Sequence, residues 1–218
     1  MKVKLISHCT DFSNPGYLKF KESLDIFKWD YQFLNERYDA YGSKMISAYN
    51  FAKKTDCSHL FICDAYDIYM LGTMQEAVDR LTNKFGSDCV VFNAEKACWP
   101  YTQWAQDYPI VESPWKYLNG GAAFVNTKRF IQLFEENPIQ HHDNDQVNLA
   151  RIYLDKRERY NMRLDTHCDV FQSIAFEHPD DFLLTDSNCP FVNLVTGSQP
   201  IIIHGNGKTN MNSIYKLL

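Results

Sequence analysis

The sequence predicts an α/β protein in which helices flank a mostly parallel sheet, with one domain over residues 1–218. Three observations support this fold class. Short apolar runs, typical of buried strands, alternate with helical patterns over residues 3–95. Strands that alternate with helices form parallel sheets with right-handed crossover connections. The 218 residues suit one large domain, and no linker or repeat divides them.

The first quarter of the chain predicts two strands and two helices. Residues 3–8 are an apolar run typical of a first strand, and a polar Asn-Pro-Gly turn follows it. Residues 17–28 carry apolar side chains at helical spacing, and residues 31–34 form a short second strand. Residues 42–54 place Met, Ile, Tyr and Ala on one helical face.

The next stretch predicts strand, helix and strand. Residues 60–63 are apolar and end abruptly in carboxylates, as expected of a buried strand. Residues 73–85 form a helix in which Thr73 is the N-cap and Glu76 completes a capping box, while Gly86 ends it. A buried strand follows at residues 89–93.

The second half of the chain begins with an aromatic, proline-interrupted stretch at residues 95–114, and long irregular segments of this kind are usually functional. A strand at residues 118–125 then enters through two glycines, which permit close backbone approach. The remaining expected elements are helices at 127–136 and 145–153 and strands at 163–165, 182–184 and 201–204.

Composition excludes several classes of protein. The net charge of −5 without a basic run excludes nucleic acid as a partner. No apolar stretch could span a bilayer, and the N-terminal apolar run is too short for a signal-peptide core, so no membrane partner is expected. The seven cysteines contain no C-x-x-C pair, which favours a reducing, cytoplasmic location. Composition is compatible with a homodimer.

Two carboxylates, Asp64 and Asp67, follow the strand at residues 60–63, with Tyr66 between them. Buried charge is costly unless it is paired or holds a metal, and strand ends in α/β sheets line ligand crevices. The pattern therefore predicts a divalent metal site that holds a phosphorylated substrate. A plain helix cap is an equally good interpretation of these residues alone.

A second strand end carries His204, followed by Gly205, Asn206, Gly207 and Lys208. Backbone N–H groups in such a loop can cradle phosphate, Lys208 can add a positive charge, and His204 can be a third metal ligand. Two carboxylates with one imidazole suit Mn²⁺ better than Ca²⁺. A Gly-Asn-Gly turn with a solvent-facing histidine is the alternative.

Six blocks of sequence, in order and at similar spacing, resemble the glycosyltransferase domain of the procollagen lysyl hydroxylases. The resemblance covers nearly the whole chain from Leu5 onward. The blocks are Phe61–Asp67, Phe92–Glu95 with Cys98–Pro100, Leu118–Gly121, Asp143–Gln146, Leu164–Asp165 with Asp169–Gln172, and His204–Gly207.

The resemblance implies a GT-A type, Rossmann-like fold that uses Mn²⁺ and a UDP-sugar. It implies that Asp64, Asp67 and His204 bind the metal and that Tyr66 stacks on the uracil. The residues implied to contact the nucleotide are Ser7, Thr10 and Lys44. The residues implied to line the sugar and acceptor side are Trp99, Asp143, Asp145 and Gln146.

The chain departs from the family at Asn144, because the family commonly has a run of aspartates before the Gln. If the sugar-facing acid corresponds to Asn144, this enzyme lacks a charge there. Three neighbouring roles remain open. The ring of Trp99 either forms a wall against a sugar ring or packs in the core. Glu95 either accepts hydrogen bonds from sugar hydroxyls or balances the charge of a buried lysine. Asp145 either lines the site or caps the helix that follows it, and it can do both.

The resemblance implies transfer of a hexose, glucose in the first place, from a UDP-sugar to galactosyl-hydroxylysine of collagen-like chains, with retention of the α configuration. UDP-glucose or UDP-galactose is then the donor. One alternative is a hydroxylysine galactosyltransferase. Another is a UDP-sugar-binding pseudoenzyme module that supports a separate lysyl hydroxylase.

Overall fold

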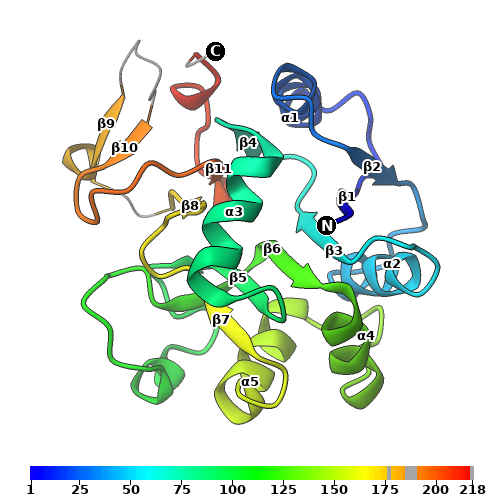
Figure 1. Cartoon of the computed structure of the whole chain (residues 1–218). Coiled ribbons are helices and arrows are strands. Elements are labelled where there is room, and N and C mark those ends of the chain that lie inside the picture. The colour runs from blue at the N-terminus through cyan, green and yellow to red at the C-terminus, as the bar shows by residue number, and fades with distance from the viewer. Residues whose placement is uncertain (176–177, 185–190, 217–218) are drawn as a thin grey trace.

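A six-stranded sheet with the order β2-β1-β3-β6-β5-β7 forms the centre of the protein. The computed structural model describes residues 1–175, 178–184 and 191–216. All neighbouring strands of this sheet run parallel except those paired with β6, which is antiparallel to β3 and β5. The predicted mostly parallel α/β sheet is confirmed (Figure 1).

The described helices and strands are as follows. The helices are α1 (Pro15–Ile26), α2 (Gly42–Ala52), α3 (Met74–Phe85), α4 (Thr127–Glu136) and α5 (Asp145–Lys156). The strands are β1 (Val3–His8), β2 (Tyr31–Leu34), β3 (His59–Cys63), β4 (Ile68–Met70), β5 (Val90–Glu95), β6 (Tyr117–Asn126), β7 (Met162–Leu164), β8 (Phe171–Ser173), β9 (Phe182–Leu184), β10 (Phe191–Asn193) and β11 (Ile202–His204). Short 3-10 turns occupy Thr102–Asp107, Pro179–Asp181, Asn206–Lys208 and Ile214–Lys216.

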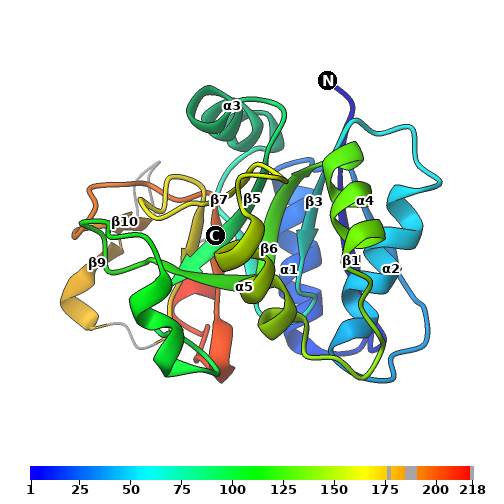
Figure 2. The same ribbon diagram turned by 90° about the horizontal axis from the view of Figure 1, so that it is seen from below.

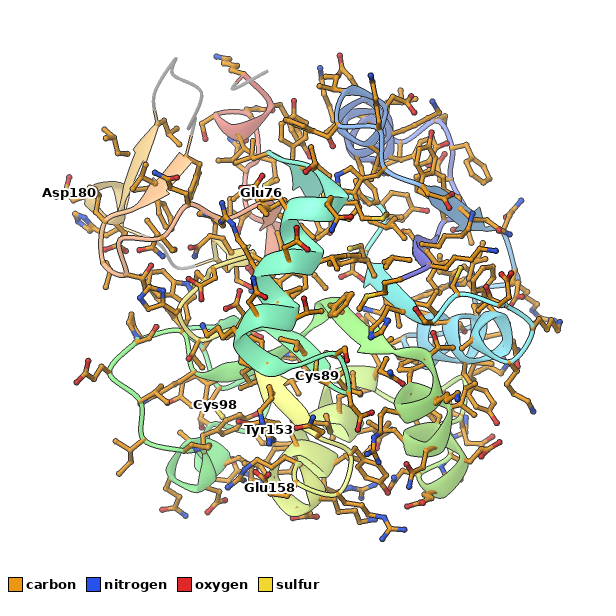
Figure 3. The ribbon with its side chains drawn as sticks, viewed as in Figure 1. Glu76, Cys89, Cys98, Tyr153, Glu158 and Asp180 are labelled. Carbon is orange, nitrogen blue, oxygen red and sulfur yellow. The ribbon has the colours of Figure 1, made fainter. Side chains whose placement is uncertain are left out.

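Helices cover both faces of the central sheet. One core cluster joins the sheet to apolar side chains of α2, α4 and α5, and a second joins it to α1 and α3. Figure 2 shows the same layers from below, with α3 apart from α4 and α5. Side chains fill the layers between the ribbons (Figure 3). None of the helices within the described ranges is long and apolar enough to cross a membrane.

Most expected elements are present, with shifted ends. The first helix begins at Pro15 because Asn14 caps it by accepting from the N–H of Gly16. Thr73 caps α3 by accepting from the N–H of Glu76, and Gly86 ends it with a φ of 78°. The predicted capping box is not formed, because the Glu76 carboxylate pairs with Arg80 instead.

Three strands escaped prediction from the sequence: β4, β8 and β10. Each is three residues long, which is too short for a period-2 pattern to be recognised. Two of them complete a small sheet with the order β4-β11-β8, in which β11 is antiparallel to β4 and parallel to β8. This sheet places His204, the last residue of β11, against Gly121 of the central sheet.

The long strand β6 passes the carboxyl ends of β3 and β5 with an irregularity. Its pairing with β5 shifts between Phe92, which is opposite Ala123, and Asn93, which is opposite Asn119. Gly120 and Gly121 lie in the bulged segment between these pairs. Bulges of this kind often lie beside active sites, and here the bulged residue Gly121 lies against His204 at the end of β11.

Candidate metal and donor site

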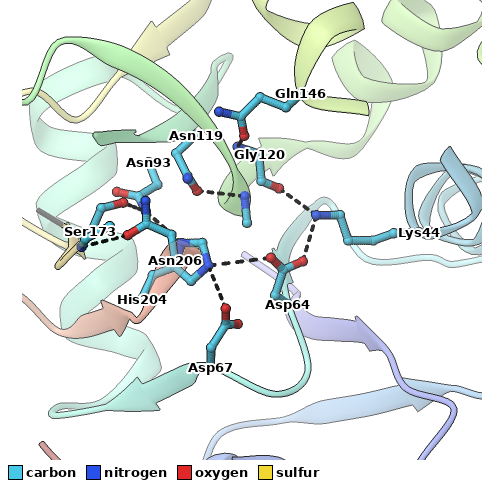
Figure 4. A network of polar contacts seen from close by, with 12 residues as sticks. Lys44, Asp64, Asp67, Asn93, Asn119, Gly120, Gln146, Ser173, His204 and Asn206 are labelled. Carbon is cyan, nitrogen blue, oxygen red and sulfur yellow. Dashed lines mark hydrogen bonds and ion pairs between the residues drawn. The ribbon is translucent and has the colours of Figure 1, made fainter. Parts of the chain in front are cut away.

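Three side chains converge where β3, β4 and β11 meet. The Nε2 atom of His204 is 3.5 Å from Oδ2 of Asp64 and 3.5 Å from Oδ2 of Asp67. One ligand atom from each residue lies within 4.8 Å of the others (Figure 4). Two carboxylates and one imidazole at this spacing can hold a divalent cation.

Backbone pairing brings these residues together from distant parts of the chain. His204 is opposite Ile68 in the ladder between β11 and β4, one residue beyond Asp67. The N–H of Gly205 donates to the carbonyl of Asp67 at 2.7 Å. The N–H of Asp64 donates to the carbonyl of Gly121 at 2.8 Å. The ladder therefore places the imidazole beside both acids.

Gly121 leaves the space that this cluster needs. A Cβ atom on Gly121 would lie 2.6 Å from Nε2 of His204, 2.7 Å from Oδ2 of Asp64 and closer still to Cε1 of the imidazole. Real Cβ atoms essentially never approach other atoms below 3.0 Å. The cluster of Asp64, Asp67 and His204 thus fits only against a glycine at this position.

Lys44, in the first turn of α2, lies between Asp64 and Asp145, the first residue of α5. Its ammonium donates to Oδ1 of Asp64 at 2.7 Å and lies 3.1 Å from Oδ2 of Asp145. Burial alone would lower the pKa of Lys44, but the charges of Asp145 and Asp64 outweigh burial and raise that pKa. The lysine is therefore a fixed positive charge between the two acids.

The charges around the cluster also set its protonation. Burial raises the pKa of Asp64, but the charge of Lys44 and the bond from His204 outweigh it and hold the pKa at about 2. Burial lowers the pKa of His204, whereas Asp67 and Asp64 raise it to about 10. A cation that uses Nε2 must therefore displace a proton from the imidazole.

Glu95, at the end of β5, is buried among three amides. Its Oε1 accepts from Gln146 at 2.6 Å and from Asn119 at 3.2 Å, and its Oε2 accepts from Asn206 at 2.8 Å. Burial raises the pKa of Glu95, and these bonds oppose the rise. The contacts of Glu95 are thus amides, and the lysine in this region pairs with Asp64 and Asp145 instead.

Tyr66 is anchored through its hydroxyl to the loop after β1. The hydroxyl oxygen accepts from the N–H of Thr10 at 3.0 Å and from the N–H of Asp11 at 2.9 Å. Its ring, half-buried, lines the cavity described next. The ring is therefore held in one orientation without any ligand.

A cavity of about 940 Å³ opens beside Asp64, Asp67 and His204. Its walls come from the ends of β1, β3, β5 and β11, the start of β6 and the N-terminus of α5. Trp99 lines one side of the cavity. Its side chain is 53% exposed, so it is not packed in the core. The predicted residues that line the cavity are Thr10, Lys44, Asp64, Tyr66, Asp67, Glu95, Trp99, Asn144, Asp145, Gln146, His204, Asn206 and Gly207.

Some predicted site residues lie outside this lining. Ser7 is buried within β1, Gly205 lies against Met211, and Asp143 accepts from the N–H of Gln140 in its own loop. The side chain of Lys208 falls outside the described part of the structure.

The structure at the start of α5 shows whether Asp145 caps this helix. Asn144, and not Asp145, is the N-cap, because its Oδ1 accepts from the N–H of Val147 at 3.1 Å. Asp145 is the first helical residue, and it pairs with Lys44. Asn144 therefore both caps α5 and lines the cavity.

Several lining residues were missed from the sequence. Tyr38 and Tyr41 line the cavity from the loop before α2, as does His8 from the end of β1. The two tyrosines precede the Gly-Ser-Lys turn that carries Lys44, and this closeness in sequence is the signal that could have identified them. Asn119 lies beside the predicted glycines and bonds Glu95.

A family model described as "PLOD GT domain" matches residues 2–216. The human protein named multifunctional procollagen lysine hydroxylase and glycosyltransferase LH3 is 26% identical over 217 residues, which cover 92% of this chain and 29% of that protein. The procollagen-lysine,2-oxoglutarate 5-dioxygenase of Drosophila melanogaster is 32% identical over 162 residues, 71% of this chain and 22% of the relative. The chain thus spans less than a third of the length of either relative.

Solved structures support the fold. A glycosyltransferase involved in the glycosylation of the major capsid of PBCV-1 superposes with a TM-score of 0.58 and 11% identity, covering 96% of each chain. At this identity the likeness concerns the fold alone. The GT-A type fold expected from the sequence is confirmed.

Proposed function

The chain belongs to the PLOD GT domain family of glycosyltransferase domains, and from this premise we propose that it transfers glucose from UDP-glucose to galactosyl-hydroxylysine of collagen-like chains, with Mn²⁺ as cofactor and within one domain over residues 1–218. The observation that carries the proposal is the Asp64, Asp67 and His204 cluster at the base of the cavity. These three residues form a cation site that opens into a cavity large enough for a sugar nucleotide.

The ligand set and the space around it support Mn²⁺. The two carboxylates and the imidazole would hold the ion, and the absent side chain at Gly121 leaves room beside them. Imidazole suits transition metals better than Ca²⁺ or Mg²⁺, which prefer oxygen ligands. When bound, such an ion neutralises the charge that develops on a diphosphate leaving group.

The chain's own residues bind and orient the donor. The fixed ring of Tyr66 offers a stacking face for the uracil, and Thr10 beside it offers a hydroxyl. Lys44 supplies a positive charge near the cluster for the phosphates. Asn206 and Gly207 line the same region of the cavity, and their loop is the part proposed to approach the diphosphate.

The opposite wall positions the sugar and the acceptor. Trp99 presents an exposed ring, and Asp145 presents a carboxylate held by Lys44. The amides that bind Glu95 fix its carboxylate, which can accept hydrogen bonds from sugar hydroxyls. Positioning of donor and acceptor is the main task left to the protein once the leaving group is stabilised.

A panel of UDP-sugars assayed for UDP release tests this function. With Mn²⁺, we expect release from UDP-glucose that increases when galactosyl-hydroxylysine or a collagen-like peptide carrying it is added. Release from UDP-galactose with free hydroxylysine would identify a galactosyltransferase instead. Absence of release from every donor, with UDP still bound, would contradict transfer and identify a binding module, the role that an uncharged Asn144 in the cavity would suit.

Tyr66→Ala should weaken UDP binding by about 1–3 kcal/mol, or about 5- to 150-fold in Kd, because it removes a stacking ring. Mn²⁺ affinity without nucleotide should stay unchanged, since Tyr66 is not in the ligand cluster. Calorimetry with UDP and with Mn²⁺ alone measures both quantities.

Tyr66→Phe is the matched control for this variant. It keeps the ring and loses the hydroxyl contacts to Cys9, Thr10 and Asp11, so its UDP affinity should lie closer to the native value. Equal UDP affinity for native protein and Tyr66→Ala would reject the stacking role.

The expected location and oligomeric state remain predictions. Free thiols support a reducing, cytoplasmic setting, and Cys9, Cys57, Cys63, Cys89 and Cys98 are among them. Sedimentation of the purified chain measures whether it forms a homodimer.

A further inference from the structure

An asparagine lies behind the imidazole of His204, on the side away from the two acids. Asn93, in β5, is 0% exposed, and the neighbouring His204 and Ser173 are 2% and 1% exposed. Nδ2 of Asn93 donates to Oγ of Ser173 at 2.7 Å and lies 3.3 Å from Nδ1 of His204 (Figure 4). Its Oδ1, also buried, has no hydrogen-bond partner among the described residues.

In either orientation of the Asn93 amide, one of its two ends lacks a partner among the described residues, so the contacts of the other end, with Ser173 and His204, decide the orientation. A neutral imidazole carries one N–H, on either Nδ1 or Nε2. If Nε2 binds the metal, Nδ1 carries the proton and needs an acceptor. An amide NH₂ at 3.3 Å cannot accept that proton, whereas the carbonyl oxygen of the same amide can.

A half-turn of the Asn93 amide exchanges its two ends in nearly the same volume. Oδ1 then faces Nδ1 of His204 and Oγ of Ser173. The serine hydroxyl accepts in one orientation and donates in the other, so its bond survives the exchange. Ser173 is held in place because β8 and β11 pair it directly opposite His204.

We propose that Asn93 is a positioning residue, which accepts the Nδ1 proton of His204 and so directs the Nε2 lone pair toward the space between Asp64 and Asp67. The inference rests on the metal site of the proposed function. Ser173 holds the amide in the accepting orientation. Asn93 acts through the histidine and does not touch the ion.

Asn93→Leu tests this role, because leucine has a similar size and no acceptor. We expect Mn²⁺ binding, measured without nucleotide from the electron paramagnetic resonance signal of free Mn²⁺, to weaken about 10- to 100-fold. Asn93→Asp keeps an acceptor and should retain native affinity or better.

Asn193→Leu is the matched control. Asn193 is also 0% exposed, but its amide donates to Gln172 and accepts from the N–H groups of Val195 and Thr196, so this variant measures the cost of a buried asparagine-to-leucine change whose bonds do not involve His204. Its Mn²⁺ affinity should remain native, and the melting temperatures of both variants report the fold.

The tautomer of His204 is a measurement that would not change if Asn93 only stabilised the fold. In ¹⁵N-histidine-labelled protein with Zn²⁺ as a diamagnetic probe, the native His204 should be protonated at Nδ1. A native protein that binds Zn²⁺ with Nδ1 unprotonated would overturn the proposal, even if Asn93→Leu failed to fold. Native Mn²⁺ affinity in a folded Asn93→Leu protein would overturn it as well. If native protein bound no Mn²⁺, the metal site of the proposed function would itself be rejected.

Discussion

Asp64→Ala and His204→Ala should each abolish Mn²⁺-dependent UDP binding. Each variant removes one of three clustered ligands, and the remaining two cannot close a site of the same charge and geometry. Asp64 also anchors Lys44, so its loss frees the lysine from one of its two acids. Titration calorimetry of UDP with and without Mn²⁺ measures the loss.

The control for these variants is Asp79→Ala. Asp79 lies on α3, where its carboxylate accepts a local bond from Gln75, so UDP binding should stay native. Circular dichroism checks that all three variants fold. UDP binding of native strength and native Mn²⁺ dependence in a folded His204→Ala protein would show that the metal lies elsewhere.

Gly121→Ala should be nearly as damaging as loss of a ligand, although it adds only a methyl group. The new Cβ would lie 2.6 Å from Nε2 of His204 and 2.7 Å from Oδ2 of Asp64, well inside van der Waals contact. His204 is buried and cannot yield without moving β11. We expect Mn²⁺ affinity to fall by at least about tenfold, the size of effects produced by misplaced metal ligands.

Gly120→Ala is a close control, one residue away in the same bulge. Its Cβ would lie 3.4 Å from Cδ1 of Leu149 and 3.7 Å from Oε1 of Gln146, both ordinary contacts. Mn²⁺ binding by this variant should stay close to native. If Gly121→Ala also bound Mn²⁺ with native affinity, the ion would not sit against this backbone.

Local patterns were sufficient for the long elements. The helix α4 was predicted with both ends correct, because Asn126 caps it and apolar residues recur on one face of it. The strands at 3–8 and 31–34 were predicted equally well. The strands β4, β8 and β10 were not predicted, since their conformation depends on pairing with other strands of the small sheets.

The candidate site shows the same division. Asp64, Asp67 and His204 were predicted because they follow apolar strands and match a family pattern, and the structure places them together. The pairing of Lys44 with Asp145 was not predictable, because a lysine in one helix and an acid in another share no sequence pattern. The cap at Asn144 was likewise decided by the geometry of one helical turn.

The sequence by itself determined the fold class, the family and which strand ends carry chemistry, because hydrophobic periodicity and short motifs are local properties. Only the tertiary structure decided that β6 runs antiparallel and bulges at Gly121, that His204 lies 3.5 Å from both acids, and that Asn93 stands behind it. These features depend on register between strands that are distant in the chain. Register is set by the packing of whole sheets and cannot be read from any one segment.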